Sequence, residues 1–202
     1  FNSNLLNLTA GTLLIVDPHA ATTLTNTLAY NHGTSYNCGV GHTLQYGDGI
    51  STDAGGNAVG FRQNTWVGSG RIALGNIIVN SLGGTNRIVT NTYTHGISGN
   101  LTITSGDYQG ASYYVAGNIV NNGTLTTTGT LFLAKYLSGT ASAATDPQTI
   151  SGSGVFRNST TTTTASFSSL TVNNTSSGGV TPGIPLSVSS TLTLTAGIVN
   201  TT

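Results

Sequence analysis

Charged residues are nearly missing from this chain of 202 residues. They make up 5% of the sequence, against about 25% in an average globular domain. There is no Glu and no Met, and five acidic and five basic side chains leave a formal net charge of zero. Because nucleic acids and anionic membranes attract proteins through basic surfaces, this composition predicts neither as a partner. The apolar runs are also far shorter than the roughly 18 residues of a membrane-spanning helix, so we expect no membrane span.

Cysteine, tryptophan and proline are scarce as well. Cys38 is the single cysteine, which excludes a disulfide within the chain and favours a small buried thiol. Trp66 is the single tryptophan, and the four prolines mark no regular boundary. Immunoglobulin-like sandwich domains usually bury a large aromatic residue, so these shortages disfavour a chain of such domains.

Apolar residues alternate with Thr, Ser and Asn along most of the chain. Leu192 and Leu194, for example, are flanked by Thr191, Thr193 and Thr195. A period of two predicts strands with one buried side, and 28 Gly together with many Asn provide the turns. The chain is therefore predicted to be all-β, with strands at 5–16, 75–80, 86–92, 100–105, 118–121, 124–135, 167–173 and 186–199.

One short phrase occurs three times. Leu-Asn-Leu-Thr-Ala-Gly at 6–11 returns as Leu-Thr-Ile-Thr-Ser-Gly at 101–106 and as Leu-Thr-Leu-Thr-Ala-Gly at 192–197. A spacing of roughly 93 residues indicates a repeat architecture. It predicts a single continuous array over 1–202, with units at about 6–100, 101–191 and 192 onward, and a chain that is a fragment of a longer one.

Short strands, Asn- and Gly-rich corners and a repeat favour a right-handed parallel β-helix, a solenoid of about nine coils with loop insertions. Stacked β-sandwich repeats remain the alternative. In a β-helix, the apolar residues of the phrase (Leu6/Leu8, Leu101/Ile103 and Leu192/Leu194) point into the core. Its Thr residues face solvent, and its Gly turns the corner. Residues 17–65 lack long alternation and contain three of the four His, so we expect a loop-rich insertion there.

Several segments of this chain resemble a known family. They are Val-Ala-Gly-Asn-Ile-Val-Asn-Asn-Gly-Thr-Leu-Thr-Thr at 115–127, Gly-Thr-Leu-Phe-Leu-Ala at 129–134, Gln-Thr-Ile-Ser-Gly-Ser-Gly at 148–154, Phe-Ser-Ser-Leu-Thr-Val-Asn-Asn at 167–174 and the segment 186–200. This style of repeat is similar to the repeat region of large, adhesin-like cell-surface proteins of Bacteroidota that the type IX system secretes. The resemblance covers roughly 66–202, and 1–65 less clearly. It implies an extracellular β-rich stalk or adhesin.

The resulting functional hypothesis is a non-catalytic structural or adhesive repeat protein at the cell surface. Its expected partners are neighbouring repeats of the same chain or end-to-end copies, and surface glycans. The alternative function is carbohydrate binding on a β-helix scaffold, because aromatic side chains combine an apolar face with a polar tip. The candidate glycan contacts are Trp66, Tyr108, Tyr113, Tyr114 and Tyr136.

Catalysis, metal binding and ice binding are weaker alternatives. A glycosidase needs two carboxyl groups about 5–9.5 Å apart, and Asp48 and Asp53 are the only close pair in the sequence; turn formation explains both. The same stretch lacks the ligand spacing of an EF-hand, which leaves Ca²⁺ binding through backbone carbonyls as an alternative to no cofactor at all. His32, Cys38 and His42 lack a fourth zinc ligand. The Thr-x-Thr sequences that could bind ice are irregularly spaced.

Overall fold

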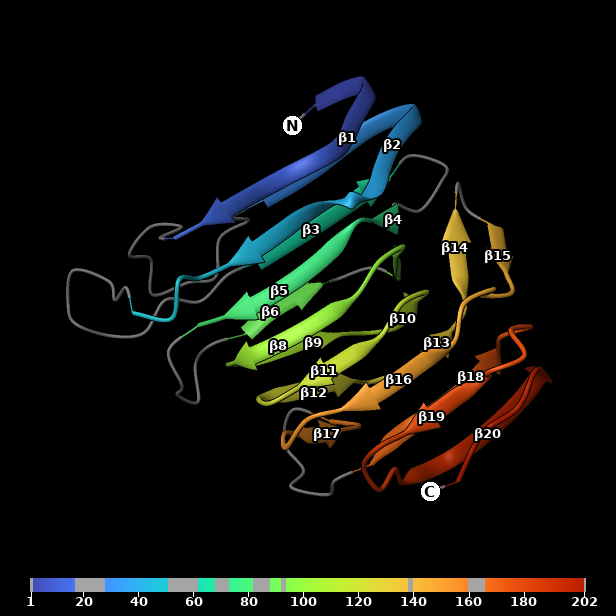
Figure 1. The fold of residues 1–202 in the computed structure, drawn as a ribbon. Coiled ribbons are helices and arrows are strands. Elements are labelled where there is room, and N and C mark those ends of the chain that lie inside the picture. Colours follow the sequence, from blue (N-terminus) through green and yellow to red (C-terminus); the bar gives the residue numbers. More distant parts are fainter. Residues whose placement is uncertain are drawn as a thin grey trace.

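The computed structural model describes residues 2–16, 28–50, 62–67, 73–81, 88–91, 94–137, 140–159 and 166–201. Within these residues the protein is all-β, without a helix, and its strands are mostly parallel (Figure 1). The strands are β1 (Asn2–Ile15), β2 (Leu28–Tyr46), β3 (Arg62–Val67), β4 (Ala73–Leu74), β5 (Asn76–Asn80), β6 (Ile88–Asn91), β7 (His95–Ile97), β8 (Leu101–Ser105), β9 (Asp107–Gly110), β10 (Tyr113–Val115), β11 (Ile119–Asn121), β12 (Thr124–Thr127), β13 (Thr130–Leu133), β14 (Lys135–Leu137), β15 (Thr140–Ser142), β16 (Gln148–Ser151), β17 (Val155–Arg157), β18 (Phe167–Asn173), β19 (Val180–Pro182) and β20 (Val188–Ala196).

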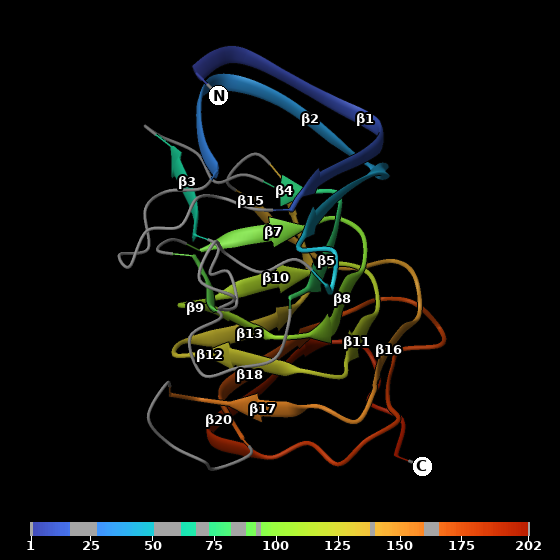
Figure 2. The ribbon, with the colours of Figure 1, turned by 90° about the vertical axis from the view of Figure 1, so that its left-hand side faces the viewer.

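The parallel strands form three stacks. The first stack runs β1-β2-β5-β8-β11-β16-β19, the second β3-β6-β9-β12-β17, and the third β4-β7-β10-β13-β18-β20. The long strand β2 joins the first two, because its start pairs with β3 and its end with β5. From β3 to β19 the chain visits the second, third and first stacks in unchanging order. Figure 2 shows the third stack as a column, with β7, β10, β13 and β18 one below another.

The length of one turn varies with the loops. Asn100 and Asn118 are successive neighbours 18 residues apart, whereas Asn118 and Thr149 are 31 apart. The longer turn contains the hairpin β14–β15, the antiparallel pair among the described strands. The first stack holds seven strands in the described residues, fewer than the roughly nine coils expected from even spacing along the chain.

Aliphatic side chains stack on one another in the interior. Leu44, Ile77, Leu101, Ile119 and Ile150 occupy one register position in successive strands of the first stack, and each is 0% exposed. Burial of one such side chain stabilises a fold by about 1.5–3 kcal/mol. A shift of one residue would turn each strand's apolar set outward, so the interior fixes the pairing register.

Asparagine side chains link successive turns at the corner before the first stack. The backbone N–H of Asn100 donates to Asn76 Oδ1 at 2.9 Å, and that of Asn118 donates to Asn100 Oδ1 at 2.8 Å. The N–H of Thr149 continues the row by donating to Asn118 Oδ1 at 2.8 Å. Each amide therefore satisfies a backbone donor that the corner takes out of the strand ladder. This asparagine ladder explains why Asn, rather than a charged residue, occupies the corner.

The repeated phrase has the local geometry expected for it. Gly11, Gly106 and Gly197 have φ angles of 88°, 91° and 97°, a backbone conformation that favours glycine at a corner. Leu101 and Ile103 are fully buried, as predicted. The side chains of Leu6 and Leu8 lie outside the described residues. The copy at 101–106 ends a strand of the first stack and the copy at 192–197 one of the third, so the phrase marks a strand with its corner and not one fixed place in the turn.

The structure contains strands that lie outside the predicted ranges, namely β3, β4, β7, β9, β10, β15, β16, β17 and β19. It also differs from the sequence prediction in two longer segments. Residues 28–46, expected to be loops, form strand β2. Leu44 and Tyr46 there are fully buried and alternate with Thr43 and Gln45, a short alternation hidden among glycines. The single strand expected at 124–135 is instead divided among β12, β13 and the start of β14, because the chain turns a corner at Gly129, whose N–H donates to Ala111 O at 2.6 Å.

We expect the Asn100→Ala variant to lower the free energy of unfolding by about 1 kcal/mol, because the N–H of Asn118 loses its acceptor. Asn100→Asp is the matched control, since a carboxylate oxygen can accept the same hydrogen bond. Urea unfolding of both variants measures the difference. Equal stability of Asn100→Ala and the unmodified chain would show that water replaces the ladder without cost.

Candidate functional site

Two of the five candidate glycan contacts lie in the interior. Tyr108 and Tyr113 are 0% exposed, and their rings stack with centroids 5.1 Å apart. Buried His95 packs edge-on against both, and its Nε2 lies 2.6 Å from the hydroxyl oxygen of Tyr108. Burial raises the pKa of both phenols well above 10.0. These residues therefore form a buried aromatic cluster within the core. Their side chains are not accessible to a ligand.

Tyr114 and Tyr136 meet on the outer side of the third stack. The ring of Tyr114 stacks on Phe132 at 4.1 Å and lies 4.5 Å from the ring of Tyr136. Tyr136 belongs to the hairpin β14–β15, and the two tyrosines are 8% and 5% exposed. The structure thus unites two of the predicted residues in a small apolar cluster separate from the main core. Trp66 lies on β3 of the second stack, and its side chain is outside the described residues.

Asp107 is an acidic residue whose surroundings shift the pKa of its carboxyl group. Desolvation raises the pKa of its carboxyl group, and hydrogen bonds from Gln109 and Thr126, together with the charge of Arg157, oppose that rise. Gln109 Nε2 donates at 2.8 Å and Thr126 Oγ1 at 3.0 Å. Arg157 Nε is buried without a hydrogen-bond partner. Among the described residues, no second carboxyl group contributes to the pKa shift of Asp107, so this part of the chain does not show the carboxyl pair of a glycosidase there. Sequence reasoning missed this cluster because Thr126 and Arg157 are far from Asp107 and Gln109 in the chain, and cross-strand register brings them together.

The other polar candidates are only partly described. Asp48 Oδ1 accepts a hydrogen bond from the N–H of Ile50 at 2.9 Å, the turn-forming contact expected of it. Asp53 and the side chains of His32 and Cys38 lie outside the described residues. Within the described part of the chain, no three His, Cys, Asp or Glu side chains cluster closely enough to hold a metal ion.

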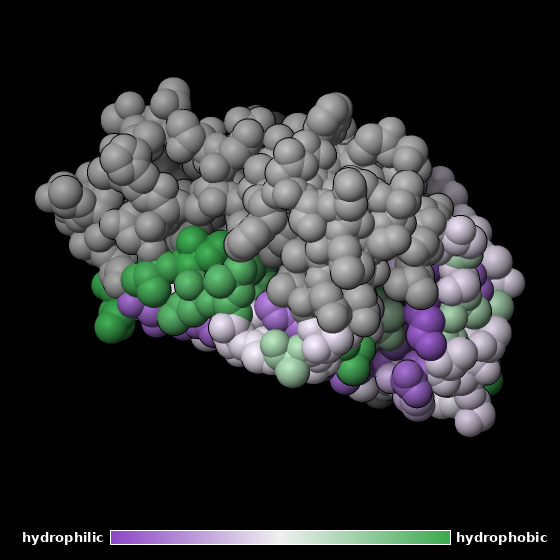
Figure 3. Space-filling model, turned by 90° about the horizontal axis from the view of Figure 1, so that it is seen from above, coloured by the Kyte–Doolittle hydropathy of each residue, from purple (hydrophilic) through white to green (hydrophobic). Residues whose placement is uncertain are grey.

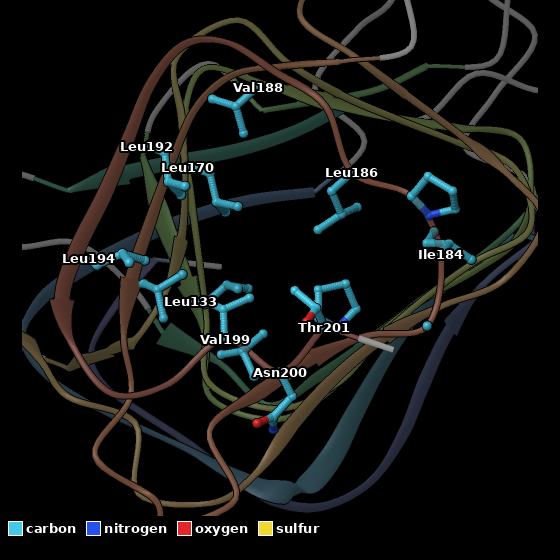
Figure 4. Close-up of a pocket in the computed structure, with 15 residues that line it drawn as sticks. Leu133, Leu170, Ile184, Leu186, Val188, Leu192, Leu194, Val199, Asn200 and Thr201 are labelled. Atoms are coloured by element: carbon cyan, nitrogen blue, oxygen red, sulfur yellow. The ribbon is translucent and has the colours of Figure 1, made fainter.

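An apolar hollow lies at the end of the molecule formed by β20, which we call the β20 end. It has a volume of about 440 Å³. Ten of its lining residues are labelled in Figure 4, and Leu170, Leu186 and Val188 point into the space that they surround. The apolar ones among them include Ile184, Leu186, Val188, Leu192, Leu194 and Val199.

Leu192 and Leu194 show why this end is open. They pair in register with Leu170 and Val172 of β18 and line the hollow with them. Leu170 and Val172 are buried, yet Leu192 and Leu194 are 56% and 58% exposed. The phrase therefore directs these two side chains inward, as predicted, but no further turn among the described residues covers them.

No family model, curated protein or solved structure matches this chain. None of the described residues belongs to a helix long and apolar enough to cross a membrane.

The raised pKa values of Tyr108 and Tyr113 predict a loss of stability in alkali. The folded state disfavours the phenolate, so the free energy of unfolding is unaffected below pH 10 and falls above it, by up to about 1.4 kcal/mol per pH unit for each phenol. Tyr113→Phe removes one of the two groups and should roughly halve that slope. Unfolding at a series of pH values, with tyrosinate absorbance as the second signal, measures it. Equal slopes in both proteins would contradict the assignment.

Proposed function

We propose that the chain is a right-handed parallel β-helix that works as a non-catalytic, structural or adhesive segment of an extracellular protein. The observation that carries the proposal is the unchanging order in which the chain visits three parallel stacks. Parallel strands joined by crossover connections are right-handed in about 98% of cases, which supports the handedness. Continuous inner rows of aliphatic residues and the asparagine ladder support a solenoid over separate sandwiches.

The surface supports a structural role. Charged residues are 5% of the chain, and hydroxyl and amide groups cover the rod. Few charges therefore lose their hydration when neighbouring segments pack against it. The resemblance to type IX-secreted surface proteins of Bacteroidota supports a location at the cell surface. Neighbouring repeats or further copies are the proposed partners, without a cofactor. Ca²⁺ at backbone carbonyls of the 48–53 stretch is the alternative.

Carbohydrate binding on the same scaffold is the second candidate function. The observation that favours it is the aromatic cluster of Tyr114, Phe132 and Tyr136 on the outer side of the third stack. Since Tyr114 and Tyr136 are nearly buried, a sugar would stack on this cluster only after the hairpin β14–β15 shifts. A polysaccharide-active enzyme and an ice-binding protein come after it. The Thr-x-Thr sequences at 102–104, 126–128 and 191–195 fall on three different stacks, which does not favour a flat threonine array.

Amide hydrogen exchange tests the β-helix. We expect the slowest exchange in β8 and β11, which have partner strands on both sides, and faster exchange towards β1 and β20, which each pair with one strand among the described residues. A solenoid opens from its ends, so protection should decline smoothly from the centre. Two separate protected blocks with a fast-exchanging junction would instead indicate stacked sandwiches.

The function is tested with the purified, labelled chain on intact cells and on a glycan array, beside an assay for released reducing sugars. The structural or adhesive proposal expects no sugar release. If the chain releases reducing sugars and the Asp107→Asn variant does not, the chain is an enzyme and the structural or adhesive proposal is wrong. Glycan binding that is lost in both Tyr114→Ala and Tyr136→Ala, with the fold intact by circular dichroism, would favour the second candidate function. Glycan binding that survives both would remove the tyrosines from it.

A further inference from the structure

We propose that the two ends of this chain are matched docking surfaces, so that the β20 end of one copy binds the β1 end of a second copy. The proposal rests on the parallel β-helix proposed above, selects a second copy from the partners proposed there, and adds the faces and the register. We call the opposite end, formed by β1, the β1 end. The two ends lie at opposite extremes of the stacks, with β1 at the top and β20 at the bottom of Figure 1.

Both ends offer a strand with a free edge. Among the described strands, β1 pairs with β2 alone and β20 with β18 alone, both in parallel. Each therefore presents backbone N–H and C=O groups on the side that faces away from its partner. Because all these strands run in one direction, the free edge of β20 can pair with the free edge of β1 of a second copy, which continues the parallel ladder.

The same phrase stands at the same corner at both ends. Gly11 comes just before the part of β1 that joins the first stack, where Leu13 pairs with Leu44. Gly197 directly follows β20 of the third stack, and the chain then returns to the first stack, where Val199 pairs with Val180 of β19. The φ angles of the two glycines, 88° and 97°, are nearly equal. The phrase at 6–11 and the phrase at 192–197 are thus equivalent segments at opposite ends.

This equivalence fixes the register of the junction. The corner glycines stack when Gly197 of one copy lies against Gly11 of the next. Leu192 then lies at the position of Leu6, Leu194 at that of Leu8, and Thr195 at that of Thr9. Within the chain, Leu192 and Leu194 already stack on Leu170 and Val172 in this manner, so the junction repeats a contact that the fold uses internally.

The surfaces agree in polarity and size. No charged residue lines the hollow, and residues 2–16 of the β1 end contain none either, so docking buries no charge. Leu14 of β1 and Val16, which follows the strand, are 44% and 37% exposed. The view onto this end shows hydrophobic residues gathered on one side (Figure 3). Gly178 and Asn200, which meet across the last turn, are 22 residues apart in the chain. An interface with roughly 20–30 residues on each side buries about 800 Å² per partner, which is enough for specific association.

Different surfaces meet at such a junction, so the contact is heterologous and each dimer keeps one free end of each kind. A heterologous contact that does not close into a ring produces an open series of copies. The expected assembly is a linear, concentration-dependent row of copies joined in one direction.

Disulfide trapping tests the register. In a Cys38→Ser background, the double variant Thr9→Cys/Thr195→Cys places one thiol at each end on positions that meet in the junction. We expect oxidation with copper phenanthroline to give a ladder of dimers, trimers and longer species on a non-reducing gel. The matched control is Thr9→Cys/Thr191→Cys, whose thiols lie four residues, or about 13 Å, out of register. That is too far for a disulfide, so the control should stay monomeric.

Three results would overturn the proposal. Efficient dimers from Thr195→Cys alone would show that two β20 ends meet each other. Equal ladders from the test and control pairs would show contact without a defined register. Monomers at every concentration in sedimentation, with no ladder, would show that the ends do not dock. If the hydrogen-exchange profile of such monomers still declines smoothly from β8 and β11, the β-helix stands and only the docking fails.

A charge in the hollow gives an independent measurement. Leu194→Asp places a carboxylate where the second copy would cover it, and should weaken self-association in sedimentation by more than about tenfold. Thr193→Asp is its control, because the neighbouring position of the same strand points away from the hollow. Since Leu194 is 58% exposed, both variants should keep the circular dichroism spectrum of the parent. Equal weakening by both variants would contradict docking through the hollow.

Discussion

The parallel hydrogen-bond ladder between successive turns is the constraint on which the rest of the structure depends. It places the same side of every strand inward, so each inner position must match the one above and below it. Ile77, Leu101, Ile119 and Ile150 meet this demand in the first stack, all fully buried. Extra residues are accommodated only between strands, which is why a turn can grow from 18 to 31 residues without disturbing these rows.

The near absence of charge follows from the same constraint. Stacked turns bring identical positions close together, and like charges there would repel one another, whereas amides and hydroxyls can donate and accept along the stack. The Asn76–Asn100–Asn118 ladder is the clearest case. Asp107 shows the cost of departing from this pattern, since desolvation raises the pKa of its carboxyl group even though Gln109 and Thr126 both donate to it.

Much of the all-β architecture could be predicted from alternation, because a strand with one buried side repeats every two residues. The inward direction of Leu101 and Leu194 and the corner glycines followed from that period and from the special backbone freedom of glycine. Strand β2 was missed because its alternation is short and interrupted by Gly. The burial of Tyr108 and Tyr113 was missed too, because a strand's period shows that two faces exist without showing which one an isolated tyrosine occupies. The Asp107 cluster depends on cross-strand register, which a single sequence does not specify.

Within a parallel stack, each inner strand has a partner strand on both sides. A strand at either end of the described stacks has a partner on one side only, so the ends differ chemically from the middle. Inside, Leu170 and Val172 are covered by the next turn, while the equivalent Leu192 and Leu194 at the last turn remain more than half exposed. The exposed surface is of the same kind as the interior contact, so whatever covers it must imitate a turn. A segment that carries the phrase of 6–11 does so with the side-chain order, the corner and the lack of charge that the last turn requires. The feature that stabilises each turn therefore also determines what can bind at the end.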